Sequence, residues 1–258
     1  MHHSISSSVS KVPEITLAFW IIKILATTLG ETGGDAVFMS MDLGYLLSTG
    51  IFAVIFFIAV SAQISASSYH PALYWNTIIA TTTVGTTLAD FADRSLGLGY
   101  AGGTALLFTL LMGSFYVWYK FQGTVSMGDV SSPRTEMFYW ITIMFSQTLG
   151  TALGDWVADD GGFGYTGSMI LFGAILLAIV ATYFFTSVSR TLLFWAAFIM
   201  TRPLGAVVGD FLDKPLKSGG LELSRYSASF SLLAAIVLLV YLSTLKNKVT
   251  EQQELDTE

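Results

Sequence analysis

The sequence predicts an all-α integral membrane protein of eight transmembrane helices, arranged as four tandem two-helix repeats in parallel orientation. Composition is the first observation: of 258 residues, 53% are hydrophobic and 12% are charged, against about 25% charged in a soluble domain. Apolar stretches between the charges approach the roughly 20 residues that cross a bilayer. The second observation is an internal repeat, which sets the architecture.

The repeat consists of a tryptophan, a glycine ten residues later and an aspartate five residues after the glycine. It occurs as Trp20/Gly30/Asp35, Trp75/Gly85/Asp90, Trp140/Gly150/Asp155 and Trp195/Gly205/Asp210. A tyrosine follows ten residues past the aspartate in the first three copies, and a six-residue insertion displaces it in the fourth. The chain is therefore one two-helix unit used four times.

Each unit begins with a signature-bearing helix, predicted at about residues 15–36, 72–92, 137–157 and 190–211. A more uniformly apolar helix follows, predicted at about 43–66, 98–121, 165–187 and 226–245, and we expect it to face lipid. One transmembrane domain results, with repeats at about 17–66, 72–121, 137–187 and 192–245 between polar termini at 1–14 and 246–258. We expect no signal peptide, since a basic region and a small-residue cleavage site are missing.

Two helices per unit return the chain to the same side of the membrane, so the repeats are parallel, unlike the inverted repeats of many transporters. The aspartates are 55, 65 and 55 residues apart, so corresponding aspartates of the two halves are 120 residues apart. The longest connection, residues 120–136, falls at this midpoint. These spacings indicate a duplicated pair of repeats.

Lysine and arginine in the loops predict the orientation. One side holds Lys11, Lys120, Arg134, Arg190, Lys246 and Lys248, and the other holds Arg94, Lys214, Lys217 and Arg225 among acidic residues. This excess predicts that both termini lie in the cytoplasm. The tryptophans then lie near the cytoplasmic interface, where we expect interfacial anchoring. The aspartates follow about 22 Å further along, at a rise of 1.5 Å per residue.

Several classes of function are excluded. The chain has no cysteine, which rules out disulfides, thiolate metal sites and thiol nucleophiles. The three histidines lie outside the predicted helices, and no nucleophile–base pair or phosphate-binding loop is visible, so we expect no enzyme. A net charge of −6 gives no support to nucleic-acid binding.

The signature glycine belongs to a small-xxx-small step in every repeat: Gly30/Gly34, Gly85/Ala89, Gly150/Gly154 and Gly205/Gly209. In lipid, such steps let helix backbones approach closely. Four copies predict that the signature helices pack against one another as an inner ring, with the aspartates on its protein-facing side.

The aspartates are the sharpest functional signal. Each lies near the C-terminal end of its helix, where the helix dipole disfavours a carboxylate. Near the hydrocarbon, an ionisable group is expensive and usually faces a partner or a wet cavity. Four inward carboxylates would repel one another unless they share protons or a cation. The alternative is structural: each aspartate bonds the following turn, or an aromatic side chain of the next repeat, and holds the repeats together.

Steps of four residues back from each aspartate define one helical face per repeat. The faces are Lys23–Thr27–Glu31–Asp35, Ile78–Thr82–Thr86–Asp90, Ile143–Gln147–Thr151–Asp155 and Phe198–Arg202–Ala206–Asp210. A charged side chain at membrane depth indicates a functional site, because burying it there is costly. We predict that Glu31 pairs with Arg202 across the ring. Lys23 is expected either to reach Asp35 through water or to snorkel to the cytoplasm.

These residues predict a cation site, because carboxylate, hydroxyl and amide oxygens are hard ligands that suit Mg²⁺, Ca²⁺, Mn²⁺, Na⁺ or protons. The predicted cation- and proton-binding set is Asp35, Asp90, Asp155, Asp210, Glu31, Thr86, Thr151 and Gln147. The four aspartates are the predicted metal ligands, and Arg202 and Lys23 tune the charge. No cofactor is expected beyond this cation. The acidic residues one turn further on, Asp93, Asp159, Asp160 and Asp213, are expected in a solvated external rim.

The segments FWIIKILATTLGETGGD, YWNTIIATTTVGTTLAD, YWITIMFSQTLGTALGD and FWAAFIMTRPLGAVVGD resemble the repeat heads of a bacterial membrane-protein family. That family has four tandem repeats of unknown function, each with two transmembrane segments and a tryptophan. The resemblance covers about residues 17–245 and implies this architecture in a bacterial cytoplasmic membrane. It implies little about function, because the family is catalogued mainly as uncharacterised. The fourth copy departs from the others at Arg202–Pro203 and in its inserted loop.

We expect a small secondary transporter that exports an inorganic cation, Mn²⁺ on ligand hardness, in exchange for protons. Protonation of the aspartates would alternate with cation binding. The alternative is a non-transporting membrane scaffold or sensor, in which the repeated Trp/Gly/Asp residues are structural. A third hypothesis is a carrier of an organic solute. The expected partners are membrane lipid and an inorganic cation or proton, and no oligomeric state is assigned.

Overall fold

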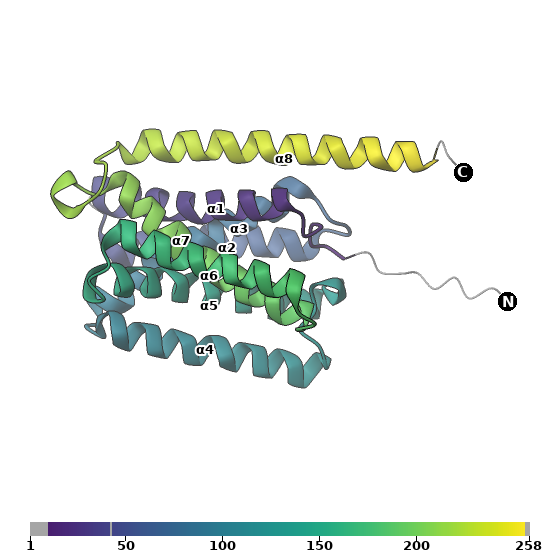
Figure 1. Cartoon of the computed structure of the whole chain (residues 1–258), viewed down its shortest axis with the longest axis horizontal. Helices are drawn as coiled ribbons and strands as arrows, with labels where there is room; N and C mark the ends of the chain where they lie inside the picture. The colour runs from purple at the N-terminus through teal and green to yellow at the C-terminus, as the bar shows by residue number, and fades with distance from the viewer. Residues whose placement is uncertain (1–9, 42, 256–258) are drawn as a thin grey trace.

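The computed structural model describes residues 10–41 and 43–255, and in this part of the chain eight long α-helices alternate between two kinds (Figure 1). The signature helices are α1 (Leu17–Asp35), α3 (Pro71–Asp90), α5 (Pro133–Asp155) and α7 (Arg190–Asp213). The other helices are α2 (Gly44–Ser65), α4 (Gly99–Gln122), α6 (Gly164–Phe185) and α8 (Arg225–Leu255). The predicted all-α class is confirmed.

Two helices extend more than three residues beyond their predicted bounds. Helix α5 begins at Pro133 rather than residue 137, because the Ser132 side chain accepts the Thr135 N–H and the proline occupies the first turn. Helix α8 continues to Leu255 rather than ending near residue 245. Part of the expected polar C-terminus is therefore helical.

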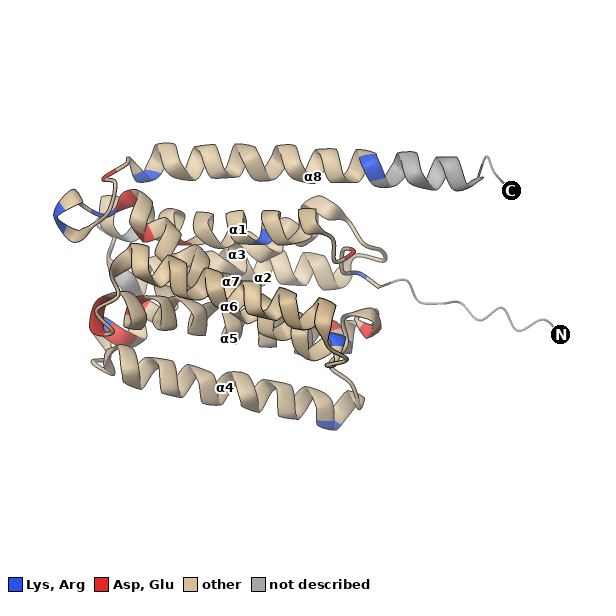
Figure 2. Cartoon of the chain, in the orientation of Figure 1, with Lys and Arg blue, Asp and Glu red and all other residues tan. Residues whose placement is uncertain are grey.

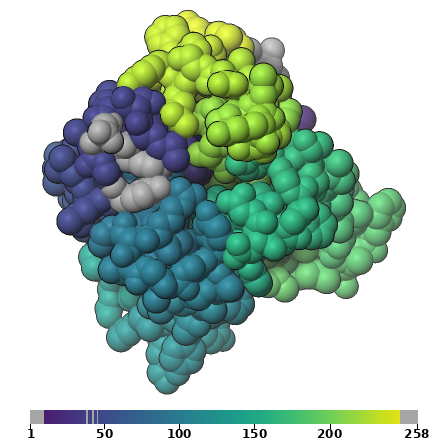
Figure 3. Space-filling model, turned by 90° about the vertical axis from the view of Figure 1, so that its left-hand side faces the viewer, coloured from purple at the N-terminus to yellow at the C-terminus, as the bar shows by residue number. Residues whose placement is uncertain are grey.

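The four signature helices form a closed inner ring. Helix α1 packs on α3, α3 on α5, α5 on α7, and α7 on α1. Each outer helix covers the inner helix that follows it, so α2 lies on α3, α4 on α5, α6 on α7 and α8 on α1. Viewed from one end, the repeats follow one another around the molecule (Figure 3). The predicted inner ring is confirmed.

The signature glycines allow the ring to close. Each one faces the residue that stands three positions before the glycine of the next repeat. A Cβ atom on the glycine would lie between 2.1 and 3.1 Å from that neighbour. The facing pairs are Gly30 with Thr82, Gly85 with Gln147, Gly150 with Arg202 and Gly205 with Thr27. The same close approach at a signature glycine thus occurs at all four contacts of the ring.

Five helices of the described chain, namely α7 and the four outer helices, are long and apolar enough to cross a membrane. The outer helices expose large apolar side chains along most of their length, as a lipid-facing surface would. The inner helices α1, α3 and α5 are more polar, and the other ring helices and the outer helices pack around them. This distribution is consistent with a membrane protein. Charged residues gather at the two ends of the bundle (Figure 2).

Three of the four signature tryptophans are buried inside the bundle, so the predicted interfacial anchoring is wrong for them, whereas Trp20 is partly exposed. Trp75, Trp140 and Trp195 are buried in an aromatic cluster at one end of the ring, which we call the aromatic end. The hydroxyl groups of Tyr74 and Tyr139 in the same cluster are 2.6 Å apart and share a hydrogen bond. The ring contacts that bury the inner helices also bury the aromatic residues in their first turns.

The segment before α1 is tied into the aromatic end. Lys11 is buried, its amine lies 2.6 Å from Glu136 Oε1, and it donates a hydrogen bond to the Ile64 carbonyl at 3.1 Å. Its backbone N–H donates to the Val130 carbonyl at 3.0 Å. One lysine therefore joins the N-terminal segment to the end of α2 and the start of α5. Residues 1–9 and the side chain of Lys248 lie outside the described part.

Replacing Lys11 by methionine should lower the stability of the protein by about 3 kcal/mol, because Glu136 is left buried without its cation. Thermal unfolding in detergent measures this loss. The matched control is Lys120→Met, which removes an exposed cation predicted on the same side of the membrane. A loss no larger than that of the control would contradict the role of the pair.

Candidate functional site

The predicted polar faces line the interior of the ring. Their sixteen residues are each at most 6% exposed. They form four layers, and each layer takes one residue from every repeat. The layer nearest the aromatic end is Lys23, Ile78, Ile143 and Phe198. The aspartates form the last layer, at what we call the carboxylate end. The four-residue steps in the sequence thus identified the ring interior.

Arg202 joins all four repeats at the centre of the ring. Its guanidinium donates to Glu31 Oε2 at 3.0 Å, to Thr86 Oγ1 at 2.6 Å and to Thr151 Oγ1 at 2.5 Å. It also donates to the Thr27 carbonyl at 3.3 Å. The predicted Glu31–Arg202 pair is present, and it joins neighbouring helices of the ring. A single arginine therefore serves as donor to three members of the predicted site.

Two further predicted residues, Lys23 and Gln147, are fully buried in the ring interior. Lys23 neither approaches Asp35 nor snorkels, because neighbouring ring helices surround it. Its amine lies 3.4 Å from Thr201 Oγ1 and 4.1 Å from the centre of the Phe198 ring. Gln147 is fully buried, and neither its amide oxygen nor its amide nitrogen has a hydrogen-bond partner among the described residues.

Side-chain cations separate the four repeat aspartates into two pairs. Lys214, the residue directly after α7, contacts Asp35 and lies 3.0 Å from Asp210. It thereby joins the last repeat to the first, where α7 meets α1. The repulsion expected between the carboxylates of these two helices is offset by an ammonium group of the chain itself.

Arg94 serves the second pair. It lies 3.3 Å from Asp90 and 3.8 Å from Asp155, and it donates to the Tyr100 hydroxyl at 3.1 Å. Arg94 and Lys214 are 120 residues apart, as are corresponding aspartates of the two halves. The two cations that neutralise the aspartates are therefore related by two-fold symmetry, as expected for a duplicated pair of repeats.

Sequence reasoning missed both of these cations, because it assigned them to external loops. A signal was available: each stands four residues after a repeat aspartate, and oppositely charged residues at that spacing are neighbours on a helix. A second missed feature is the π-helical turn that follows the aspartate in repeats one to three, at Ala36–Ser40, Phe91–Ser95 and Trp156–Asp160. Such turns are rare and frequently occur at functional sites.

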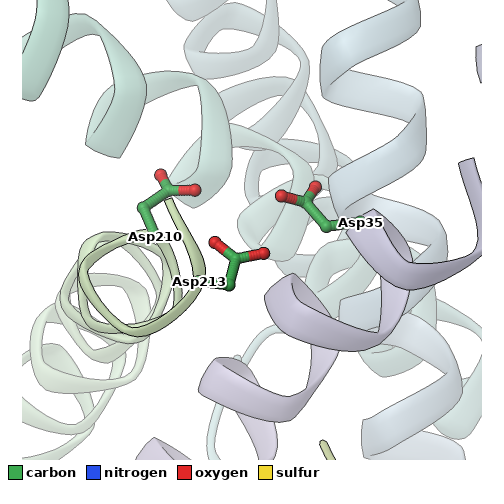
Figure 4. Close-up of side chains that lie close together, drawn as sticks. All are labelled: Asp35, Asp210 and Asp213. Carbon is green, nitrogen blue, oxygen red and sulfur yellow. The ribbon is translucent and has the colours of Figure 1, made fainter. Parts of the chain in front are cut away.

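A cluster of three carboxylates surrounds Lys214. Asp35, Asp210 and Asp213 each offer one oxygen, and these oxygens lie within 4.8 Å of one another (Figure 4). The cluster contains two of the four predicted metal ligands, whereas the other two share Arg94. Arg225 donates to Asp213 Oδ2 at 2.6 Å, and Asp213 Oδ1 has no hydrogen-bond partner among the described residues.

The expected solvated rim is only partly correct. Asp159 and Asp160 are exposed as predicted, but Asp93 and Asp213 are buried. Asp93 lies in the π turn η2 (Phe91–Ser95), which packs on α4, and Asp213 is the last residue of α7. Both buried residues stand three positions past a repeat aspartate, where the continuing helical turn faces the bundle. Asp159 and Asp160 stand four and five positions past Asp155, on the exposed side of the turn η4 (Trp156–Asp160).

The cluster is chemically suited to a hard cation. Carboxylate oxygens are preferred ligands of Mg²⁺, Ca²⁺ and Mn²⁺, and Asp213 keeps one oxygen for a further contact. Lys214 supplies a positive charge there, on a side chain with four rotatable carbon–carbon bonds and a strongly hydrated head group. A cation that entered the cluster would have to displace this ammonium group.

The comparisons with known proteins identify one family. The family described as "Repeat of Unknown Function (DUF347)" matches the chain four times, over residues 18–69, 73–124, 138–189 and 193–248. No curated protein and no solved structure matches the chain. The family matches agree with the four-repeat resemblance noted in the sequence.

Proposed function

Since the chain belongs to this family of repeats of unknown function, we propose from its own geometry that it is a small secondary transporter with eight transmembrane helices. Its cargo is an inorganic cation, Mn²⁺ or a similarly hard ion, exported in exchange for protons. The observation that carries this proposal is the cluster of Asp35, Asp210 and Asp213 around the Lys214 ammonium group. It lies at one end of a ring whose interior is polar.

The buried charges support transport over a purely structural role. The ring interior holds Lys23, Glu31 and Arg202 in addition to the carboxylate layer, all at most 6% exposed. Ionisable groups at membrane depth are expensive, and they mark ion pathways and proton relays in membrane proteins. A bundle that needed only assembly could close through its glycines and aromatic cluster, without these charges.

In the proposed cycle, the Lys214 ammonium group occupies the cation site and neutralises its carboxylates between transport events. An entering cation takes over the oxygens of Asp35, Asp210 and Asp213, and Lys214 moves away. Protonation of the carboxylates then weakens their hold on the cation and favours its release. The aromatic cluster closes the other end of the ring in this conformation, so the carboxylate end is the side from which the cluster is reached.

We further propose that the protein lies in the cytoplasmic membrane of a bacterium with both termini in the cytoplasm. Lysine and arginine are in excess in the loops at the aromatic end, and such an excess favours the cytoplasmic side. The carboxylate end then faces outward.

Thermal unfolding of the purified protein against Mn²⁺, Mg²⁺, Ca²⁺ and Na⁺ tests the cation site. One ion should raise the stability saturably, by about 2.7 kcal/mol at a hundred times its dissociation constant, and Asp210→Asn should abolish this gain. The matched control is Asp160→Asn, which changes an exposed carboxylate and should keep the response.

The same experiment addresses the scaffold or sensor hypothesis, which the bridging of helices by Lys214 and Arg94 favours. Under that hypothesis no cation stabilises the wild type, and Asp210→Asn only lowers stability. That outcome would refute the proposed cation site. An ion that does bind is then tested for flux into vesicles that contain the protein, with and without a pH gradient.

A further inference from the structure

Asp93 and Asp213 are two-fold equivalents with different partners. They are 120 residues apart, each three residues past a repeat aspartate, and they are 5% and 6% exposed. Arg225 neutralises Asp213 at 2.6 Å. Neither carboxyl oxygen of Asp93 has a hydrogen-bond partner among the described residues. The duplicated framework thus buries two carboxyl groups and supplies an arginine to one of them.

Helix α4 covers the Asp93 carboxyl group. A Cβ atom on Gly103 would lie 1.6 Å from Asp93 Oδ1, so the carboxyl group rests directly against the α4 backbone. Arg225 is the first residue of α8, and the first residue of α4 is Gly99. Repeat two therefore has a glycine where repeat four has the neutralising arginine.

The charged groups near Asp93 come from few elements. The π turn that carries it packs against α2, α3 and α4. Helix α2 has no acidic or basic residue, α3 contributes Asp90, and α4 contributes Tyr100 near its start, with Lys120 at its far end. Arg94 in the same turn is the neighbouring cation, and Asp90 and Asp155 already hold it.

An ionised carboxylate in this position would be costly, because a buried charge without a partner costs several kcal/mol and an unpartnered polar group also loses its hydration. A proton removes the charge. Burial raises the pKa of the Asp93 carboxyl group above its ordinary value, and the Arg94 guanidinium opposes that shift in part. The Asp213 carboxylate differs in having a cation beside it, since Arg225 donates to its Oδ2 at 2.6 Å.

We infer that Asp93 is a proton-binding site of the transport cycle, held here as the neutral acid and separate from the Asp35/Asp210/Asp213 cluster. This inference rests on the proposed function for its role in transport. The two equivalent positions of the duplication then have different roles. Asp213 binds the cation together with Asp210 and Asp35 of repeat one, and Asp93 carries the proton.

The step itself is a simple proton transfer. The O–H bond of the Asp93 acid breaks, the proton passes to water, and a carboxylate remains. This carboxylate needs a cation, and Arg94 is the neighbouring one. Movement of Arg94 towards it would loosen the contacts of Arg94 with Asp90 on α3 and Asp155 on α5. Loss of the proton would thereby change the packing of two ring helices.

Infrared spectroscopy of the purified wild-type protein tests the protonation directly, because a protonated carboxylic acid has a carbonyl stretch that an ionised carboxylate lacks. We expect a component of this band that disappears as the pH rises and is absent from Asp93→Asn. It should persist in the control Asp160→Asn, which changes an exposed carboxyl group. If Asp93→Asn does not fold, Asp93→Ala replaces it, since alanine leaves no buried polar atom. A band that is missing in the wild type, or unchanged in the Asp93 variants, overturns the inference.

Two further measurements connect Asp93 to stability and to the cation. Because the folded state holds this proton more tightly than the unfolded chain, stability should fall as the pH rises above the ordinary aspartate pKa of about 4. The fall should be smaller in Asp93→Asn. Cation binding should release a proton in the wild type and one proton fewer in Asp93→Asn, which still binds the cation. Equal release in both overturns the coupling, whereas a protein that no cation stabilises instead refutes the proposed function.

Discussion

The variant Arg202→Met should be less stable than the wild type by about 3–5 kcal/mol, the cost of removing one partner from a buried ion pair. Glu31 would remain in the ring interior without its cation, and the hydroxyl groups of Thr86 and Thr151 would lose the donor that joins them. Methionine keeps the aliphatic stem that packs against Gly150. The loss therefore reports on the charge rather than on the packing. Unfolding in detergent measures it.

A double variant separates the ion pair from other effects of the substitution. Glu31→Gln combined with Arg202→Met removes both charges, so it should be more stable than Arg202→Met alone. Arg190→Met serves as the control, because Arg190 is exposed. If Arg202→Met is as stable as the wild type, Glu31 does not need the Arg202 charge to stay buried, and the arginine does not hold the four repeats together.

The variant Gly205→Ala should disrupt the ring where the last repeat meets the first. The added Cβ atom would lie 2.1 Å from Thr27 Oγ1 and 3.0 Å from the Thr27 backbone carbon, so a rotamer change alone cannot relieve the clash. Overpacking of this kind costs about 1–3 kcal/mol, and the backbone contact places the expected loss at the upper end. The fall in unfolding temperature measures it.

The matched control for this prediction is Gly113→Ala on the exposed side of α4, where a Cβ atom meets nothing within 4 Å. Alanine is favoured over glycine in a helix by about 1 kcal/mol, so this variant should be as stable as the wild type or more stable. Equal stability of Gly205→Ala and Gly113→Ala would show that α1 and α7 do not pack through the signature glycine.

The sequence was most informative where the feature was local and repeated. The tryptophan–glycine–aspartate spacing located four helices, and steps of four residues selected the face that the ring buries, because a helix fixes which residues share a face. The glycine steps predicted the inner ring for the same reason: a missing side chain at a fixed position permits close approach in every copy.

Predictions were less accurate for side chains whose contact partners lie on another helix. Lys23 was expected to reach Asp35 or the interface, but it lies beside Thr201 and Phe198 of α7. Asp93 and Asp213 were expected in a solvated rim, because a loop was assumed after each repeat aspartate. The tryptophans were expected at the lipid interface, since their sequence positions match both that location and the aromatic end of a closed ring.

Repetition and helical periodicity thus established four equivalent units, an inner ring and a layer of four buried carboxylates, all of which follow from spacing along a single helix. The tertiary structure decided how these carboxylates are neutralised, with Lys214 between Asp35 and Asp210 and Arg94 between Asp90 and Asp155. It also buried Asp93, whose carboxyl oxygens have no hydrogen-bond partner among the described residues. Buried charge must be balanced in three dimensions, and the balancing groups come from different repeats, so only the closed ring brings them together.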